Sequence, residues 1–387
     1  MISRDELAAW LRLAETPGLG RASARRLLAA FGSPERVLGA GESALAAVIG
    51  PALARVLLAP HPLRDALPDT TWRWLDAASV DAPRDIVVLG DPRYPDLLLQ
   101  AADPPLLLHT IGRVELLRAA SVAIVGSREA TPQGLENAHD FALHLSERDL
   151  TIVSGLALGV DGAAHEGGLA GAGSTIAFVG TGLDQVYPRR HEALAARIAT
   201  AGLIASEYTL GMPPRPDNFP RRNRLIAGVS QGTLVVEAAL QSGSLITARM
   251  ALESGREVFA IPGSIHSPQA HGCHRLIQEG AKLVETGDDV LNELRASGST
   301  LRTGRLSAAQ PSLFASSPAE FAAAADAADS PDASLLRALG HDPVTFDALS
   351  SRTGLPTDRL AAQLLDLELR GWVQRLPGGL LQRRGSA

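Results

Sequence analysis

Between Ser121 and Leu294, short apolar segments alternate with longer segments of helical periodicity. The apolar segments have the length of strands and lie at Val122–Val125, Thr151–Ser154, Thr175–Val179, Leu203–Ala205, Thr233–Val236, Val258–Ile261 and Lys282–Val284. Four of them are almost continuously apolar, which is typical of strands buried on both faces. Helices between such strands require right-handed crossover connections. The sequence therefore predicts an α/β fold with a Rossmann-like, doubly wound parallel sheet.

The residues before this region predict a different architecture. Residues 3–58 are rich in Ala, Leu and Arg and predict short helices, one of them over Ala22–Phe31 after the turn Thr16–Gly20. A Gly-x-Gly turn before a helix is typical of helix-hairpin-helix modules, whose backbone N–H groups can bind a phosphate. A plain helical cap domain is the alternative. Residues 60–110 are Pro-rich and predict irregular chain with one strand at Ile86–Leu89.

The residues after it predict a linker and a small domain. Residues 297–330 are mostly Ala, Ser, Pro and Gly, which is typical of a flexible linker. The remainder predicts three helices and a hairpin, at Ala333–Leu339, Thr345–Thr353, Thr357–Arg370, Trp372–Leu376 and Gly379–Arg383. This order is that of a winged helix. Its third helix carries several acids, so a protein-contacting role stays open beside a DNA-binding one.

We therefore predict four parts along the chain: a helical module resembling SAM or helix-hairpin-helix domains (1–70), a Rossmann-like domain (71–296), a linker (297–330) and a winged helix (331–387).

Composition excludes several classes of protein. The net charge of −6 argues against a protein that coats duplex DNA by bulk positive potential, so any nucleic-acid site must be a local patch. The single cysteine, Cys273, excludes an intrachain disulfide and a cysteine-rich zinc site. No apolar stretch is long enough for a membrane span, and the acidic N-terminus is no signal peptide. We expect a cytoplasmic protein without metal or cofactor.

A cluster of arginines follows one aromatic ring at Phe219-Pro-Arg-Arg-Asn-Arg-Leu-Ile-Ala-Gly228. Arg221, Arg222 and Arg224 surround Asn223 directly after Phe219. Like charges this close repel each other unless an anion lies over them. Single-stranded nucleic acid suits this segment, because arginines bind phosphates and the ring offers a stacking surface for a base. The alternative is a solvated basic turn that starts a helix.

Other motifs follow the predicted strands, where open α/β sheets bind their ligands. Gly126, Ser127 and Arg128 end the first strand and suit a phosphate, although Arg128 could instead form a surface ion pair. The segment lacks the G-x-G-x-x-G pattern, which disfavours a dinucleotide cofactor. After the fifth main strand and Glu237, a serine-rich turn places Ser244 at another helix N-terminus.

The loop after the second strand is rich in glycine. Ser154, Gly155 and Gly159 lead into a helix start whose backbone N–H groups form a potential anion nest. Asp161 and His165 stand four residues apart and share a helix face. They are either an acid/base pair or structural hydrogen-bonding residues that hold the loop, and the structural role is favoured. No nucleophile–base set, metal-ligand cluster or Walker A motif accompanies them.

The segments IVGSRE, SGLALGVDGAAHEGGL, FPRRNRLIAG, VVEAALQSGSLITA and GREVFAIPG resemble the DNA-processing protein A (DprA, or Smf) family. The resemblance holds in order and spacing over about residues 85–295. It implies a non-catalytic recombination mediator that binds single-stranded DNA and protects it. It also implies loading of the RecA recombinase in natural transformation and a homodimer formed through the Rossmann-like domain.

The resemblance also implies roles for single residues. A pocket of Gly126, Ser127 and Arg128 would hold a phosphate, and Phe219 would stack a base. Arg215 would supply the cation that some relatives take from a lysine next to this position. Arg221 and Arg224 would share one helix face toward the strand, and Asn223 would buttress the loop instead. The segment His271–Val284 would form the dimer contact.

Two other functions remain as alternatives. Nucleoside-monophosphate phosphoribohydrolases share a related fold and a Pro-Gly-Gly-x-Gly-Thr-x-x-Glu signature. Here the segment Ser230–Glu237 lacks the Pro-Gly-Gly, and the glutamate comes one residue late. A duplex-binding winged-helix regulator is the other alternative, and the acidic third helix argues against it.

Overall fold

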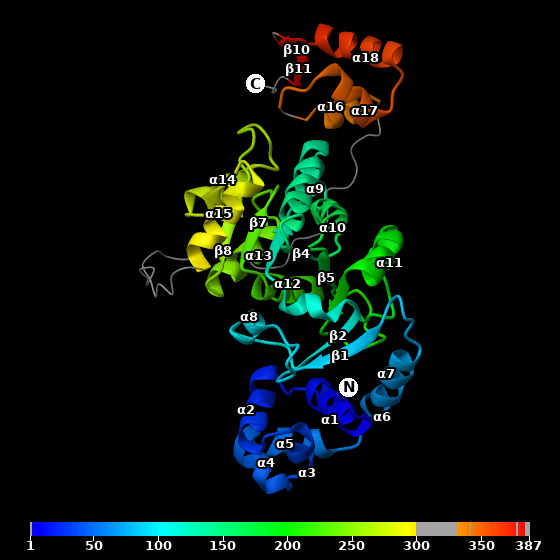
Figure 1. Cartoon of the computed structure of the whole chain (residues 1–387), viewed down its shortest axis with the longest axis vertical. Coiled ribbons are helices and arrows are strands. Elements are labelled where there is room, and N and C mark those ends of the chain that lie inside the picture. Colours follow the sequence, from blue (N-terminus) through cyan, green and yellow to red (C-terminus); the bar gives the residue numbers. More distant parts are fainter. Residues whose placement is uncertain (1, 299–330, 341, 377, 384–387) are drawn as a thin grey trace. The chain divides into compact units, whose positions relative to one another are not determined.

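The computed structural model describes residues 2–298, 331–340, 342–376 and 378–383. The chain divides into two compact units, residues 1–290 and 291–387 (Figure 1). Most of the predicted linker, residues 299–330, lies outside the described residues. The predicted limits of the four parts stay predictions.

The N-terminal part of the first unit, from Arg4 to Asp76, consists of helices and the turns between them. The helices are α1 (Arg4–Glu15), α2 (Arg21–Phe31), α3 (Pro34–Gly39), α4 (Glu42–Ile49), α5 (Pro51–Leu58), α6 (Pro62–Asp65) and α7 (Leu67–Asp76). Ser3 is the N-cap of α1, and its hydroxyl accepts a hydrogen bond from the N–H of Glu6. Leu7 and Leu11 of α1 are fully buried in a cluster that includes sheet residues such as Ile204. The helical module and the sheet therefore share one hydrophobic core.

A nine-stranded sheet forms the centre of this unit. Its strands are β1 (Arg84–Val88), β2 (Leu107–Gly112), β3 (Ser121–Val125), β4 (Thr151–Ser154), β5 (Thr175–Phe178), β6 (Leu203–Ser206), β7 (Gly232–Val235), β8 (Glu257–Ala260) and β9 (Lys282–Leu283). They lie in the order β1-β2-β6-β5-β4-β3-β7-β8-β9. β2 alone runs opposite to the other eight strands, and it pairs antiparallel with both β1 and β6. Every residue of β3 to β7 is buried, which confirms the predicted α/β sheet.

Helices connect the strands and set the position of the site. They are α8 (Asp96–Leu99), η1 (Val114–Arg118), α9 (Pro132–Ser146), α10 (Val160–Ala170), η2 (Arg189–His191), α11 (Glu192–Ala201), α12 (Asn218–Val229), α13 (Gly243–Glu253), α14 (His271–Gln278) and α15 (Gly287–Gly298). The pair α9 and α10 packs together, as does the pair α12 and α13. Right-handed crossovers place these pairs on opposite faces of the sheet, because strand order reverses between β3 and β7.

The reversal between β3 and β7 is the topological switch point, outside which such sheets bind ligands. We use the term carboxyl rim for the segments that follow the parallel strands, namely residues 126–131, 155–159, 179–191, 207–221, 236–242 and 261–270. All the site residues predicted by the sequence follow these strand ends.

The expectation of irregular chain over residues 60–110 is wrong in part. The segment contains all of α6, α7 and α8 and the first four residues of β2, besides the predicted β1. Prolines precede β2, and His109 and Thr110 interrupt its apolar residues. Both of these polar residues are nevertheless buried. The strand was missed because its burial depends on pairing with β1 and β6, which lie far away in the sequence.

The second unit is a winged helix, as predicted. Its elements are α16 (Pro331–Leu339), α17 (Phe346–Thr353), α18 (Thr357–Leu369), β10 (Val373–Leu376) and β11 (Leu380–Arg383). The two strands form an antiparallel hairpin, and Val344 bridges to Leu381 beside it. Leu349, Leu360 and Leu364 are fully buried between the helices, so this unit has a core of its own.

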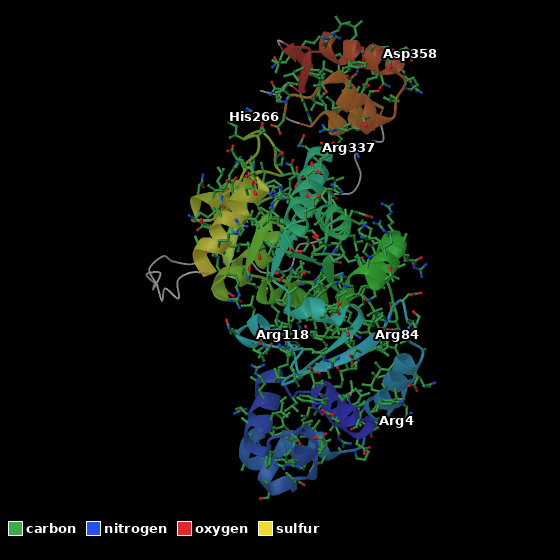
Figure 2. All side chains as sticks on the ribbon, in the orientation of Figure 1. Arg4, Arg84, Arg118, His266, Arg337 and Asp358 are labelled. Carbon is green, nitrogen blue, oxygen red and sulfur yellow. The ribbon has the colours of Figure 1, made fainter. Side chains whose placement is uncertain are left out.

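Charged side chains lie on the surface of both units (Figure 2). Arg84 and Arg118 are labelled on the first unit, and Arg337 and Asp358 on the second. In the part of the chain that the structure describes, no helix has both the length and the apolar character needed to cross a bilayer.

Candidate nucleic-acid interface

The arginine cluster lies in the first turns of α12, and the helix separates its members. Arg222 points inward and is only 3% exposed. Its guanidinium donates hydrogen bonds to the carbonyl oxygens of Gly155 and Phe178, at the carboxyl ends of β4 and β5. A Cβ on Gly155 would lie 2.2 Å from this guanidinium. Burial lowers the pKa of Arg222 to about 10, although the charge of Asp161 opposes the shift. Arg222 thus ties α12 to the sheet, and this placement does not fit the phosphate contact expected from the sequence.

Arg224 is also engaged within the protein. Its side chain pairs with Glu207 and donates to the carbonyl oxygen of Asp103. Arg21 of α2 pairs with both of these acids, at 3.1 Å from Glu207 and 2.6 Å from Asp103. Arg224 therefore belongs to a network that holds the helical module against the sheet. It does not share a solvent-facing side of α12 with Arg221, because its carboxylate partner covers it.

The remaining polar residues of this segment face outward. Arg221 in the first turn of α12 and Arg215 in the preceding loop are both exposed. Asn223 is half-buried, and the buttressing hydrogen bond expected of it is not seen among the described residues. These three side chains remain available to a ligand.

Three side chains from different rim segments meet around the start of α12. The ring centroids of Phe219 and Tyr187 lie 5.4 Å apart at an interplanar angle of 37°. The guanidinium carbon of Arg128 lies 5.7 Å from the centroid of Phe219, within cation–π range. Asn218 fixes the helix start, because its amide donates to the carbonyl oxygen of Gly180 at 2.9 Å. The predicted partners Phe219 and Arg128 are therefore in contact, and Tyr187 joins them.

The loop after β3 offers one exposed cation. Ser127 is buried, and its hydroxyl accepts a hydrogen bond from the N–H of Glu129 at 3.1 Å. A Cβ on Gly126 would lie 2.6 Å from a methyl carbon of Val160, so α10 already occupies the space that glycine leaves. Arg128 alone among the three predicted residues presents its side chain to solvent.

The loop between β4 and α10 is held by internal hydrogen bonds. The Asp161 carboxylate accepts from the N–H groups of Gly155 at 3.1 Å and Ala157 at 3.3 Å. Burial raises the pKa of Asp161, and the charge of Arg222 opposes that rise. The hydroxyl of Ser154 donates to a carbonyl of β3, and Gly159 is the N-cap of α10 with a φ of 77°. The N–H groups that were expected to bind an anion therefore already donate to the carboxylate of Asp161.

His165 has both ring nitrogens engaged. Its Nε2 accepts from the N–H of Leu156 at 3.2 Å, and its Nδ1 lies 2.7 Å from the hydroxyl of Thr175. That hydroxyl donates to the carbonyl oxygen of Ile152, so Nδ1 carries the proton and donates to Thr175. Burial lowers the pKa of His165 to about 3. A neutral, fully bonded imidazole holds Leu156 at its unusual φ of 59° and has no lone pair left for catalysis.

Side chains of the loop after β7 hold the N-termini of two helices, α9 and α13. Glu237 accepts from both the N–H and the hydroxyl of Thr131, at 2.9 and 2.6 Å. Thr131 in turn caps α9. Ser242 caps α13, and its hydroxyl lies 2.7 Å from that of Ser244, which is 6% exposed. Glu237 therefore positions α9, whereas a phosphoribohydrolase would need it as a reactive group.

Arginines without an acceptor gather on the carboxyl rim. Within residues 84–290, all of which the structure describes, eleven arginines have a hydrogen-bond or carboxylate partner. The others are exposed and have none, and they are Arg128, Arg189, Arg190, Arg215 and Arg221. Every one of these five follows the carboxyl end of a strand. The sequence assigned three of them to the DNA site, whereas Arg189 and Arg190, which directly follow Tyr187, received no role of their own.

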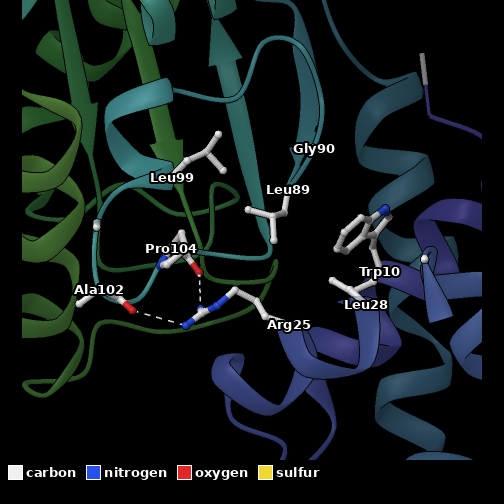
Figure 3. Close-up of a pocket in the computed structure, with 10 residues that line it drawn as sticks. Trp10, Arg25, Leu28, Leu89, Gly90, Leu99, Ala102 and Pro104 are labelled. Carbon is white, nitrogen blue, oxygen red and sulfur yellow. Dashed lines mark hydrogen bonds between the residues drawn. The ribbon is translucent and has the colours of Figure 1, made fainter. Parts of the chain in front are cut away.

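Two other kinds of site are alternatives to this surface, a metal site and a cavity in the first unit. The described residues contain no group of three His, Cys, Asp or Glu side chains that could hold a metal ion. A cavity of about 450 Å³ lies between the helical module and the loops that flank β1 and α8 (Figure 3). Trp10 and Leu28 face Leu89 across it, and Arg25 donates to the carbonyls of Ala102 and Pro104. This cavity is a seam between two packed parts.

Comparison with known families identifies the chain. The family model of DNA recombination-mediator protein A matches residues 85–295, more than half of the protein. The chain belongs to this family. A second model, the DprA winged helix domain, matches residues 318–379. Both results confirm the family that the sequence motifs indicated.

Curated members of the family cover most of the chain. Protein Smf of Escherichia coli (strain K12) is 41% identical over 292 residues, which is 75% of each protein. Protein Smf of Synechocystis is 33% identical over 405 residues, covering 99% of this chain and 100% of the relative. Similarity to the second protein thus extends over both units.

Solved structures of family members confirm the fold. The X-ray structure of DNA processing protein A from Streptococcus pneumoniae superposes with a TM-score of 0.64 and 37% identity, covering 76% of this chain and 98% of that one. DNA processing protein A from Helicobacter pylori, studied for its single-stranded DNA binding mode, gives 0.51 and 30% identity. That match covers 55% of this chain and 96% of the other.

The winged helix of this family member presents an apolar strip. Leu365 and Leu369, four residues apart on α18, are 53% and 80% exposed, and Trp372 is 44% exposed. Arg370 on the same helix end is paired with Asp366. The third helix thus offers apolar side chains and neutralised charge, which suits a protein contact better than a phosphate backbone.

Proposed function

We propose that this protein is a recombination mediator that binds single-stranded DNA on the carboxyl rim. The observation that supports this most strongly is the set of unpaired arginines around Phe219. Arginines elsewhere in the domain have a hydrogen-bond or carboxylate partner within the protein itself. The arginines on the rim have no such acceptor, so the phosphates of a polyanion would supply one.

A single strand fits this surface better than a duplex. The net charge of −6 makes a broad electrostatic attraction to duplex DNA weak, so binding depends on local contacts. The aromatic rings at the rim can stack only on bases that are not already stacked in a duplex. Arg128, Arg215 and Arg221 come from two rim segments and would contact successive phosphates.

We also propose that the protein acts without catalysis. Each candidate acid or base near the rim is committed to the fold. Asp161 accepts two backbone N–H groups, His165 has both nitrogens bonded, and Glu237 holds Thr131. The expected loading of RecA would then consist of handing over a bound strand, for which we expect the protein in the cytoplasm.

The segment His271–Val284 is proposed as the contact of a homodimer. It contains α14 and β9, and β9 is the last strand at its edge of the sheet. Leu283 on β9 is 50% exposed. An apolar residue on an open strand edge suits pairing with a second copy. Leu283→Lys should shift the protein from dimer to monomer in sedimentation velocity, and a monomeric wild type would contradict the proposal.

A titration with labelled oligonucleotides tests DNA binding directly. Fluorescence anisotropy with a dT oligonucleotide should show tighter binding than with a duplex of equal length. Phe219→Ala should cost about 1–3 kcal/mol, and Arg128→Ala should weaken binding and flatten its salt dependence. Arg118→Ala is the matched control, because Arg118 is exposed before β3, at the opposite end of the sheet. Wild-type affinity in both rim variants would contradict the proposed site.

RecA loading needs its own measurement. We expect the protein to accelerate RecA filament formation on single strands coated with a single-strand binding protein. Variants that bind DNA poorly, such as Arg128→Ala, should lose this acceleration in proportion to their loss of affinity. Strand binding without any effect on RecA would restrict the proposal to DNA protection.

A further inference from the structure

We propose that the N-terminal helical module positions the single-strand site, with Arg21 of α2 acting on the first two turns of α12 through Glu207. Arg21 and Glu207 are positioning residues in this inference, because neither contacts the strand. The inference rests on the proposed function, since it concerns how that site is held in shape. It also gives a role to the start of α2, for which the sequence left phosphate binding and a plain helical cap as alternatives.

The first observation is that α12 carries ligand-facing and inward-facing residues on the same two turns. Phe219 and the exposed Arg221 lie in its first turn, and Arg224, one turn later, is paired inside the protein. Successive turns of a helix are joined by backbone hydrogen bonds and move together. A shift of Arg224 therefore displaces Phe219 and Arg221 as well.

The second observation is that two residues directly after β6 hold α12 at two points. Glu207 pairs with Arg224, and the side chain of Glu207 is only 6% exposed. The hydroxyl of Tyr208 donates to the carbonyl oxygen of Asn218, the first residue of α12, at 3.1 Å. The position of Glu207 and Tyr208 therefore sets the position of the helix turns that carry the site.

The third observation is that the module supplies the other half of this contact. Arg21, the first residue of α2, donates to Glu207 at 3.1 Å and to Asp103 at 2.6 Å. Arg25, one turn further along α2, donates to Asp103 at 3.0 Å. Arg224 donates to the backbone carbonyl of the same Asp103. Glu207 and Asp103 thus lie between the guanidinium groups of the module and that of α12.

Together these contacts couple the module to the site. Arg21 and Arg224 share one carboxylate oxygen of Glu207, so Glu207 cannot turn toward either cation without weakening its contact with the other. Charged groups with so little exposure lose much of their stabilisation when one partner is removed. Without Arg21, Glu207 gains other side-chain positions, and the first turns of α12 sample several orientations. Only some of these orientations bind the strand, which lowers the affinity.

Fluorescence anisotropy with labelled dT20 and the full-length protein tests this coupling. We expect Arg21→Gln to raise the Kd for dT20 about 5- to 150-fold. The slope of log Kd against log salt should keep its wild-type value, whereas the loss of a phosphate contact would lower it by about 0.7. The matched control is Arg55→Gln, because Arg55 is an exposed arginine of the same module whose acidic partner, Glu42, also lies in the module. Its Kd should equal that of the wild type.

The path through Glu207 is tested by a double variant. Glu207→Gln should weaken binding of dT20 to a similar degree, and Arg21→Gln with Glu207→Gln should bind no more weakly than the weaker single variant. Losses that add up would overturn the path, because the two residues would then act separately.

Hydrogen exchange gives a readout that a general loss of stability would not reproduce. In Arg21→Gln without DNA, amides in the first two turns of α12 should exchange faster than in the wild type, while those of α9 keep their wild-type rates. Bound dT20 should slow exchange at the start of α2 in the wild type but not in Arg21→Gln, because coupling between two sites is reciprocal.

The outcomes separate this inference from the proposed function. If Arg128→Ala and Phe219→Ala bind weakly while Arg21→Gln binds like the wild type, the inference alone is overturned. A salt slope lowered by about 0.7 in Arg21→Gln would also overturn it, because Arg21 would then contact the strand itself. Faster exchange in α9 and α12 alike would overturn it too, since the variant would only be less stable. If Arg128→Ala, Phe219→Ala and Arg21→Gln all bind like the wild type, the proposed function fails as well.

Discussion

Neighbouring arginines on α12 should behave in opposite ways when each is replaced. Arg222→Met keeps an apolar stem of similar length but removes the buried guanidinium. The change leaves the carbonyls of Gly155 and Phe178 without this donor and leaves Asp161 without its nearest cation. Arg221→Ala removes an exposed side chain without an internal partner. Only the first change should therefore affect folding.

The size of the effect follows from burial. Removing one partner of a buried charged pair costs about 3–5 kcal/mol. The first unit spans residues 1–290. At about 2.1 cal/mol/K for each residue, its unfolding entropy is about 0.6 kcal/mol/K, so Tm should fall by about 5–8 °C. Arg221→Ala should leave Tm within about 1 °C and reduce the salt slope of single-strand binding by about 0.7.

Differential scanning calorimetry and anisotropy on the same samples check both halves of this prediction. A wild-type Tm for Arg222→Met together with weak DNA binding would show that Arg222 reaches the strand. The internal hydrogen bonds would then be the wrong explanation of its position. A large fall in Tm for Arg221→Ala would equally contradict the division of roles on α12.

Three further predictions concern the packing around this site. Glu207→Gln should lower Tm as much as Arg222→Met, because Glu207 is buried between Arg21 and Arg224, while the exposed control Glu115→Gln should leave it unchanged. Gly155→Ala should destabilise the wild type but cost little in the Arg222→Met background, since its Cβ collides with that guanidinium; equal costs in both backgrounds would refute the contact. Burial lowers the pKa of His109 to about 4, below the ordinary value of about 6.5, so its contribution to stability is present above pH 6.5 and is lost as pH falls toward 4. Since His109 is fully buried, His109→Leu should reduce the stability lost between pH 7 and 5 by about 2 kcal/mol in urea titrations, and an unchanged loss would argue against a neutral buried ring.

The sequence predicted which segments lie together on the rim better than which of their side chains face solvent. Motifs after the strands placed Arg128 and Phe219 on one rim, and the structure brings them into contact. The same motifs could not separate Arg221 from Arg222, because successive helix residues differ by about 100° and the buried direction depends on the sheet below. Tyr187 was visible in the sequence, but its exposure on top of Phe219 appears only after two loops have folded together.

The sequence by itself determined the family, the alternation of strands and helices, and the rim at which we propose that a single strand binds. Local patterns suffice there, because hydrophobic period and glycine-rich turns act within a few residues. Only the tertiary structure decided that two of the three clustered arginines, Arg222 and Arg224, bind partners inside the protein. It also decided that His109 and β2 belong to the core, and that unpaired charge surrounds an aromatic pair. Each of these depends on whether a distant residue supplies a partner or removes water, and no local pattern records that.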